Sequence, residues 1–245
     1  MKITFLGSGD AFGSGGRFNT CFHVASASHR LLIDCGSSAM IAIRKFGIEP
    51  NEIDCVLITH CHGDHFGGLP YFILDAQLIS RRTRPLVIAG PVGLSDRLQQ
   101  MMEACFPGSS QVARKFDTQI VELAAPGVTT VLQARVGAVP VRHPSGSTPS
   151  LALRVELDGK VLAYTGDTEW VDGLVDIATS ADLLIAEGYT LDRKVKFHLD
   201  VETLKSKLPA LGVARVVLTH MSRDMLAQQH QAGLETASDG LSLDI

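Results

Sequence analysis

The sequence predicts an α/β fold in a single domain over residues 1–245. Short apolar runs that suit strands alternate with segments that suit helices along most of the chain, a pattern typical of α/β proteins. In residues 119–157 the apolar runs are broken by glycine, proline and polar residues, which indicates antiparallel strands. The hydrophobic content of 45% is enough for a sizeable core, and no segment has the composition of a linker.

Strands are expected where short, mainly apolar runs are bounded by turn-forming residues. They are residues 2–6, 19–24, 30–34, 54–59, 86–89, 136–142, 151–157, 160–164, 181–186, 213–219 and 241–245. The first of them leads into a polar, glycine-rich loop at residues 7–16. Asp158 and Gly159 are well suited to the turn of a hairpin.

Helices are expected where apolar positions recur with helical spacing after a capping residue or a turn. They are residues 38–46, 69–80, 93–104, 169–178 and 201–208. Arg81, Arg82 and Arg84 follow the second of these helices. The simplest interpretation of this basic cluster is a solvated helix end, and contact with a substrate phosphate is the alternative.

A dense set of metal-binding residue types follows the strand at 54–59. His60, His62, Asp64 and His65 lie within six residues of one another. Imidazole nitrogens and a carboxylate are the donors that borderline cations such as Zn²⁺ favour. His60 and His62 alone could be a surface pair, but Asp64 and His65 directly after them favour a metal site.

Polar residues follow four further predicted strands in the same way. The five positions are Asp34, the segment 60–65, His143, Asp167 and His220. Taken alone, Asp34 and Asp167 are ordinary turn or cap carboxylates, and a single histidine before a proline, such as His143, carries little information.

Composition limits the function classes. The formal net charge of −4 argues against a general nucleic-acid binder, which would have a basic excess. The N-terminal apolar run is too short for a signal peptide, and no run has the length of a membrane span. Five cysteines, mostly within apolar runs, are expected to be buried free thiols in a reducing cytoplasm.

The motif Thr-His-x-His-x-Asp-His after an apolar strand resembles the signature of the metallo-β-lactamase fold hydrolases. The resemblance extends over nearly the whole chain, since the later polar positions also follow strands in the family's order. It implies an αββα four-layer sandwich and a metal-dependent hydrolase. It also implies that Asp34 braces the metal loop, and that residues 7–16 lie at the rim of the site.

The resemblance further implies two divalent metal ions, with Zn²⁺ expected first and Mn²⁺ or Fe as alternatives. It assigns His60, His62 and His143 to one ion and Asp64, His65 and His220 to the other, with Asp167 bridging them. Asp64 is thereby both a ligand and a catalytic residue. Two such ions activate a shared hydroxide for attack on phosphorus or on a carbonyl carbon.

Within the family, the chain looks most similar to ribonuclease Z and the cyclic-phosphate phosphodiesterases. Lys196-Phe197-His198 stands where these enzymes carry an additional histidine, which implies that His198 is a general acid. Glu187 resembles the acidic partner that orients it. Gly188 and Tyr189 depart from the His-Glu-Ala-Thr of ribonuclease Z, which weakens the assignment of Glu187.

The expected substrate is a small phosphodiester. Ribonuclease Z carries a long arm for tRNA, usually between the positions of His143 and Asp167, and only one predicted hairpin fits between them here. The alternatives are an acyl hydrolase of the lactonase or thioesterase type, a tRNA 3′ endonuclease, and a non-catalytic binding protein. Homodimers are common in the family, so a homodimer is a further expectation.

Overall fold

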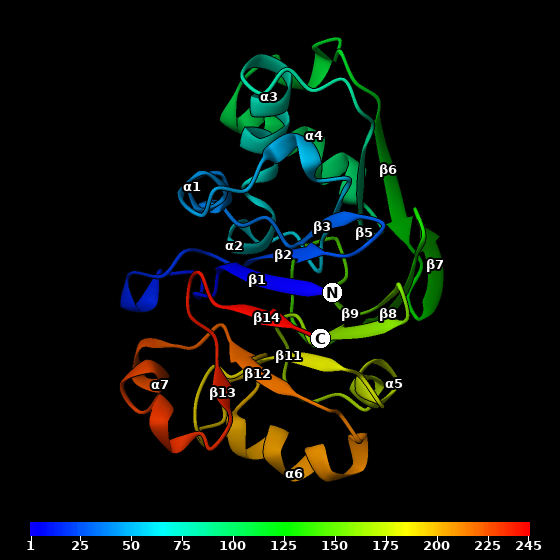
Figure 1. The fold of residues 1–245 in the computed structure, drawn as a ribbon. Coiled ribbons are helices and arrows are strands. Elements are labelled where there is room, and N and C mark those ends of the chain that lie inside the picture. The colour runs from blue at the N-terminus through cyan, green and yellow to red at the C-terminus, as the bar shows by residue number, and fades with distance from the viewer.

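Two seven-stranded sheets lie face to face, and helices cover the outer face of each sheet (Figure 1). The structure is a computed structural model that describes residues 1–245. Helices α1 to α4 lie on one side of the pair of sheets, and α5 to α7 lie on the other. The predicted αββα sandwich is confirmed.

The first sheet combines antiparallel and parallel strands. Its strands in spatial order are β14 (Ser242–Asp244), β1 (Lys2–Gly7), β2 (Cys21–Ala25), β3 (Arg30–Ile33), β4 (Cys55–Leu57), β5 (Leu86–Pro91) and β6 (Thr118–Leu123). Pairing is antiparallel from β14 to β3 and parallel from β3 to β6. The parallel strands have helical crossovers between them, as such pairs require.

The second sheet repeats this plan. Its strands in spatial order are β13 (Glu235–Thr236), β12 (Val216–Thr219), β11 (Leu183–Glu187), β10 (Lys160–Tyr164), β9 (Leu151–Leu157), β8 (Ala134–Pro140) and β7 (Gly127–Val131). Pairing is antiparallel from β7 to β10 and parallel from β10 to β13. Each sheet therefore has an antiparallel part and a parallel part.

Seven α-helices complete the sandwich, and none is both long and apolar enough to cross a bilayer. They are α1 (Ala39–Lys45), α2 (Gly63–Phe66), α3 (Leu69–Leu78), α4 (Leu94–Cys105), α5 (Gly173–Ala178), α6 (Val201–Leu211) and α7 (Arg223–Ala227). Short 3₁₀ turns occupy Ser14–Gly16, Pro50–Glu52, Ser109–Gln111 and Gln229–Gln231.

Three apolar clusters correspond to the three spaces between the four layers. The central cluster joins Phe22 and Leu57 of the first sheet to Leu153 and Ile185 of the second. A second cluster lies between the first sheet and α1, α3 and α4, and a third lies between the second sheet and α5, α6 and α7. All five cysteines are free and four of them are buried, as the sequence predicted.

Two element predictions are wrong. The sequence predicts antiparallel strands from residue 119 onward, but β6 pairs in parallel with β5, because α4 carries the chain across between them. The helix expected from 169 begins only at Gly173. Tertiary hydrogen bonds hold the residues before it in a loop: Thr168 donates its N–H to Glu187 (2.9 Å), and Arg142 forms a bridge with Glu169.

The basic cluster after α3 is solvated at Arg81 and Arg84, as predicted, but not at Arg82. Arg82 is 1% exposed, and its guanidinium donates to the carbonyl oxygens of Pro50, Asn51, Ile53, Arg84 and Pro85. A planar group with five donors can satisfy several backbone acceptors at once, which periodicity in the sequence does not reveal.

Replacing Arg82 by methionine should therefore lower the free energy of unfolding by about 3–5 kcal/mol, because several buried carbonyl groups lose their donors. Arg84→Met is the matched control. Its side chain is 59% exposed and pairs with Asp54, so the loss should stay below about 1 kcal/mol. Urea denaturation of both variants measures the difference, and equal losses would contradict the assigned role of Arg82.

His23 on β2 provides a prediction about pH. Burial first, and then the charges of Arg30 and Lys2, lower the pKa of His23 from 6.5 to about 4. In the unfolded chain the imidazole takes up its proton near pH 6.5, so falling pH favours the unfolded chain between these two values. Wild type should lose about 1–2 kcal/mol more stability from pH 7 to pH 5 than His23→Leu. Denaturation of both proteins at pH 7 and pH 5 measures this difference. An equal loss of stability in wild type and His23→Leu would contradict the prediction.

Candidate metal centre

The loop between β4 and α2 is packed tightly against the loop after β3. Cys35 N–H donates to the carbonyl oxygen of His65 (2.6 Å), and Ser37 N–H donates to that of Gly63 (3.0 Å). A Cβ atom at Gly36 would lie 2.2 Å from the carbonyl oxygen of Asp64, so this approach requires glycine. The loop that carries the clustered histidines is thus held rigidly at the end of the first sheet.

A group of three histidines forms at one side of the site. His60, His62 and His143 bring ring nitrogens within 4.8 Å of one another. His143 Nε2 and His62 Nδ1 are 3.0 Å apart, and the backbone carbonyl of Phe197 lies 3.1 Å from His143 Nδ1. Burial, followed by the neighbouring imidazoles, lowers the pKa of His60 and that of His62. Neutral imidazoles with converging lone pairs suit a cation.

A second group adjoins the first. Asp64, His65, Asp167 and His220 also have donor atoms within 4.8 Å of one another. Asp64 Oδ2 lies 3.2 Å from His65 Nε2 and 3.2 Å from His220 Nε2. The structure therefore assembles donors from four separate strand ends, because β4, β8, β10 and β12 all end near this point.

Asp167 lies between the two groups. Its Oδ2 atom is 3.3 Å from His65 Nε2, 3.3 Å from His220 Nε2 and 3.9 Å from His143 Nε2. The carboxylate of Asp167 is thus within reach of both groups.

Asp34 supports the metal loop from behind. It is fully buried, and its carboxylate lies 2.7 Å from His65 Nδ1 and accepts hydrogen bonds from the N–H and hydroxyl of Thr59. These contacts fit the bracing role that the resemblance implies for Asp34. A carboxylate on the outer nitrogen of a histidine orients the other nitrogen, here Nε2, toward the centre.

These residues fit divalent cations. His60 Nε2, His65 Nε2 and Asp167 Oδ1 are buried without a hydrogen-bond partner, an arrangement that is costly unless an ion completes it. Positive charge is strongly favoured here: despite burial, Asp167, Asp64 and Glu187 raise the pKa of His220 to about 10. A mixed nitrogen and oxygen donor set of this kind matches Zn²⁺ or Mn²⁺.

Glu187 and His198 form a pair beside the second group. His198 Nδ1 lies 2.5 Å from Glu187 Oε1, and Glu187 is fully buried. The other oxygen of Glu187 accepts hydrogen bonds from the N–H groups of Thr168 and Leu199. Burial lowers the pKa of His198, but the hydrogen bond and charge of Glu187 outweigh it and raise that pKa above the ordinary value.

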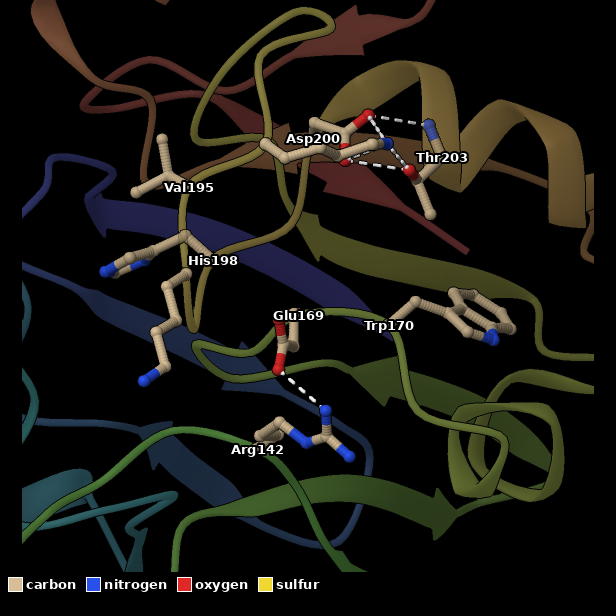
Figure 2. Close-up of a pocket in the computed structure, with 9 residues that line it drawn as sticks. Arg142, Glu169, Trp170, Val195, His198, Asp200 and Thr203 are labelled. Atoms are coloured by element: carbon tan, nitrogen blue, oxygen red, sulfur yellow. Dashed lines mark hydrogen bonds and ion pairs between the residues drawn. The ribbon is translucent and has the colours of Figure 1, made fainter.

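Two cavities reach His198. One of about 200 Å³ opens over the candidate ligands, and it is lined by Asp10, Ala11, Phe12, His62, Asp64, His143, Asp167, Tyr189, His198 and His220. The other, of about 490 Å³, has the Arg142–Glu169 ion pair and the contacts of Asp200 with Thr203 on its walls (Figure 2). Arg81, Arg82 and Arg84 line neither cavity.

The sequence missed part of this lining. Asp10, Ala11 and Phe12 of the loop at residues 7–16 line the cavity, in agreement with the predicted rim position, but the sequence indicated no role for Asp10 or Phe12. Tyr189 was noted only as a departure from ribonuclease Z, whereas its ring stacks on that of His198 at 4.3 Å and 24°. The one sequence feature that could have drawn attention to Phe12 is the presence of an aromatic residue in a loop that is otherwise mainly polar and glycine-rich.

Fold and site together define a metal-dependent hydrolase of the metallo-β-lactamase fold. The short form of human tRNase Z is 28% identical to this chain with a TM-score of 0.80, covering 100% of this chain and 99% of that one. YhfI from Bacillus subtilis, at 18% identity and a TM-score of 0.80, covers 99% and 98% and shows the same fold.

The chain also matches one particular family of this fold. The model of the family described as anti-Pycsar protein Apyc1 matches residues 1–237, and the chain belongs to this family. Ribonuclease Z of Limosilactobacillus fermentum is 27% identical over 278 residues, covering 91% of this chain and 88% of that protein. The predicted similarity to ribonuclease Z is confirmed.

Proposed function

We propose that the protein hydrolyses a small phosphodiester, with His198 as the general acid. The observation that carries this proposal is the Glu187–His198 pair at the wall of the cavity over the candidate ligands. Attack on a phosphodiester expels an alkoxide, which requires a proton unless it is unusually stable. Hydrolysis of a thioester expels a more stable thiolate, so a thioesterase with the same donor set would depend less on this pair.

Each residue of the pair has a defined part in the proposal. Glu187 accepts the Nδ1–H of His198, which fixes the ring and favours its protonated form. Nε2–H is then the donor that faces the leaving oxygen. Tyr189 stacks on the same ring and limits its rotation. His198 thus delivers a proton from a fixed position.

The two groups around Asp167 are the proposed ligands. His60, His62 and His143 would hold one divalent cation and Asp64, His65 and His220 the other, with Asp167 between them. Such cations supply Lewis-acid stabilisation of the phosphoryl oxygens and lower the pKa of bound water. Zn²⁺ is the first choice from the donor set, and Mn²⁺ or Fe is the alternative.

A small substrate fits the chain better than tRNA. Between His143 and Asp167 the structure has a loop and the β9–β10 hairpin, with no inserted arm. The similarity to ribonuclease Z nevertheless makes tRNA 3′ cleavage the second candidate function. Free buried thiols support a reducing compartment such as the cytoplasm, and a homodimer is proposed from the family pattern alone.

The test is an assay of the metal-supplemented protein with three substrates side by side. Bis(p-nitrophenyl) phosphate represents small diesters, nitrocefin represents acyl substrates, and a precursor tRNA with a 3′ trailer represents the ribonuclease Z reaction. Turnover of the first alone is the expected result. Turnover of nitrocefin without the diester would overturn the proposal, and cleavage of the precursor tRNA would select the second candidate.

A further inference from the structure

Phe12 is the most exposed large hydrophobic side chain of the protein. It is 85% exposed, yet it lines the cavity that holds the candidate ligands. A phenyl ring left in water forgoes the favourable free energy of burying its apolar surface. At the mouth of a site, this surface is available to a molecule that enters.

The loop that carries Phe12 is braced. Asp10 is 1% exposed, and its carboxylate accepts hydrogen bonds from Phe12 N–H (3.2 Å), Ser14 N–H (2.9 Å) and Ser14 Oγ–H (2.7 Å). Gly13 continues the turn with a φ of 65°, a conformation that favours glycine. The ring of Phe12 is therefore presented from a preformed turn.

The ring of Phe12 is not part of the aromatic stack that holds the proposed proton donor. His198 stacks on Tyr189, and the ring of Phe12 forms no aromatic contact with either of them. The leaving oxygen of a diester must lie at His198 if that residue protonates it. A substituent that reaches Phe12 from the same phosphorus is therefore the one that does not leave.

We propose that Phe12 is a specificity-determining residue that packs against the non-leaving substituent of the diester and favours a planar, unsaturated group over a small alkyl group. The proposal rests on the phosphodiesterase function proposed above. Aromatic rings gain free energy from offset or edge-on packing with another ring, and a methyl group offers little surface for it. Phe12 would thus select among diesters without taking part in proton transfer.

Two diesters with the same leaving group test this. Bis(p-nitrophenyl) phosphate and methyl p-nitrophenyl phosphate both release p-nitrophenolate, but the group that stays is aryl in one and methyl in the other. Phe12→Ala should lower kcat/KM about tenfold for the first, mainly through KM, and less than about twofold for the second. Phe12→Tyr, which keeps the ring, should restore the preference.

The outcomes are distinct. If wild type hydrolyses neither diester, the proposed function fails. If wild type hydrolyses both but Phe12→Ala changes them equally or not at all, the function stands and the role of Phe12 is overturned. Light scattering of the variant tests another use of the exposed ring: a loss of oligomer on Phe12→Ala would assign Phe12 to a subunit contact and overturn the proposal.

Discussion

His198→Ala is expected to lower kcat/KM for a phosphodiester with an alkoxide leaving group by about 10²–10⁴-fold. In the proposed mechanism the variant loses the proton that Nε2–H would deliver from a ring held by Glu187 at 2.5 Å. Initial rates with an alkyl diester, at saturating metal, measure this loss. The protein should stay folded, since the side chain is 21% exposed at the cavity wall.

The leaving group supplies the control for this variant. p-Nitrophenolate is stable enough to depart without a proton, so His198→Ala should affect bis(p-nitrophenyl) phosphate far less than the alkyl diester. Glu187→Gln should also affect the alkyl diester more than bis(p-nitrophenyl) phosphate, but its loss of kcat/KM should be smaller than that of His198→Ala. The amide still contacts the imidazole, but it orients the ring less well and does not stabilise its positive charge. An equal loss on both diesters would argue that His198 acts through the metal centre and not as an acid.

Asp167→Asn is expected to remove bound metal and to lower activity by at least about 10²-fold, an effect larger than the loss from an outer partner of a ligand. Asp167 Oδ2 is near histidines of both groups, so one amide substitution disturbs both. Metal content by mass spectrometry is measured alongside the rate. Asp192→Asn, in an exposed loop, is the matched control and should keep both the metal content and the rate of wild type.

Removal of metal by a chelator provides a readout that does not depend on activity. Asp34, Asp64, Asp167 and Glu187 concentrate negative charge in a small buried volume, and a cation there offsets their repulsion. The chelated protein should melt at a lower temperature, and Zn²⁺ or Mn²⁺ should restore it. In Asp167→Asn the restoration should be weak, and an undiminished response would argue against Asp167 as a ligand.

Only part of the candidate donor set has a local signal in the sequence. His60 to His65 are adjacent in sequence, whereas His143, Asp167 and His220 were suggested as ligands by resemblance, and the structure brings them together. The contact between Glu187 and His198 could be suggested only by resemblance, because a turn of the chain between β11 and α6 determines it.

The features that the sequence did not predict depend on packing between segments that are far apart in the chain. The burial of Arg82 is caused by carbonyl groups of residues 50–53, which no period in the sequence connects to it. The late start of α5 follows from hydrogen bonds of Thr168 with Glu187 and Arg142. The position of Phe12 at the cavity mouth has no periodic signature, since it lies in a loop shaped by one buried aspartate.

The repeated plan of the two sheets has a practical consequence. Strands β1 to β6 lie in one sheet and β7 to β13 in the other, and the chain passes between them once before β14 returns to β1. The three-histidine group takes His60 and His62 from the first half and His143 from the second, so neither half alone carries it. If the chain were divided between β6 and β7, neither fragment alone would hydrolyse substrate. Activity would appear only when the two fragments associate. Such a pair could serve as a split-enzyme reporter of association between fused proteins.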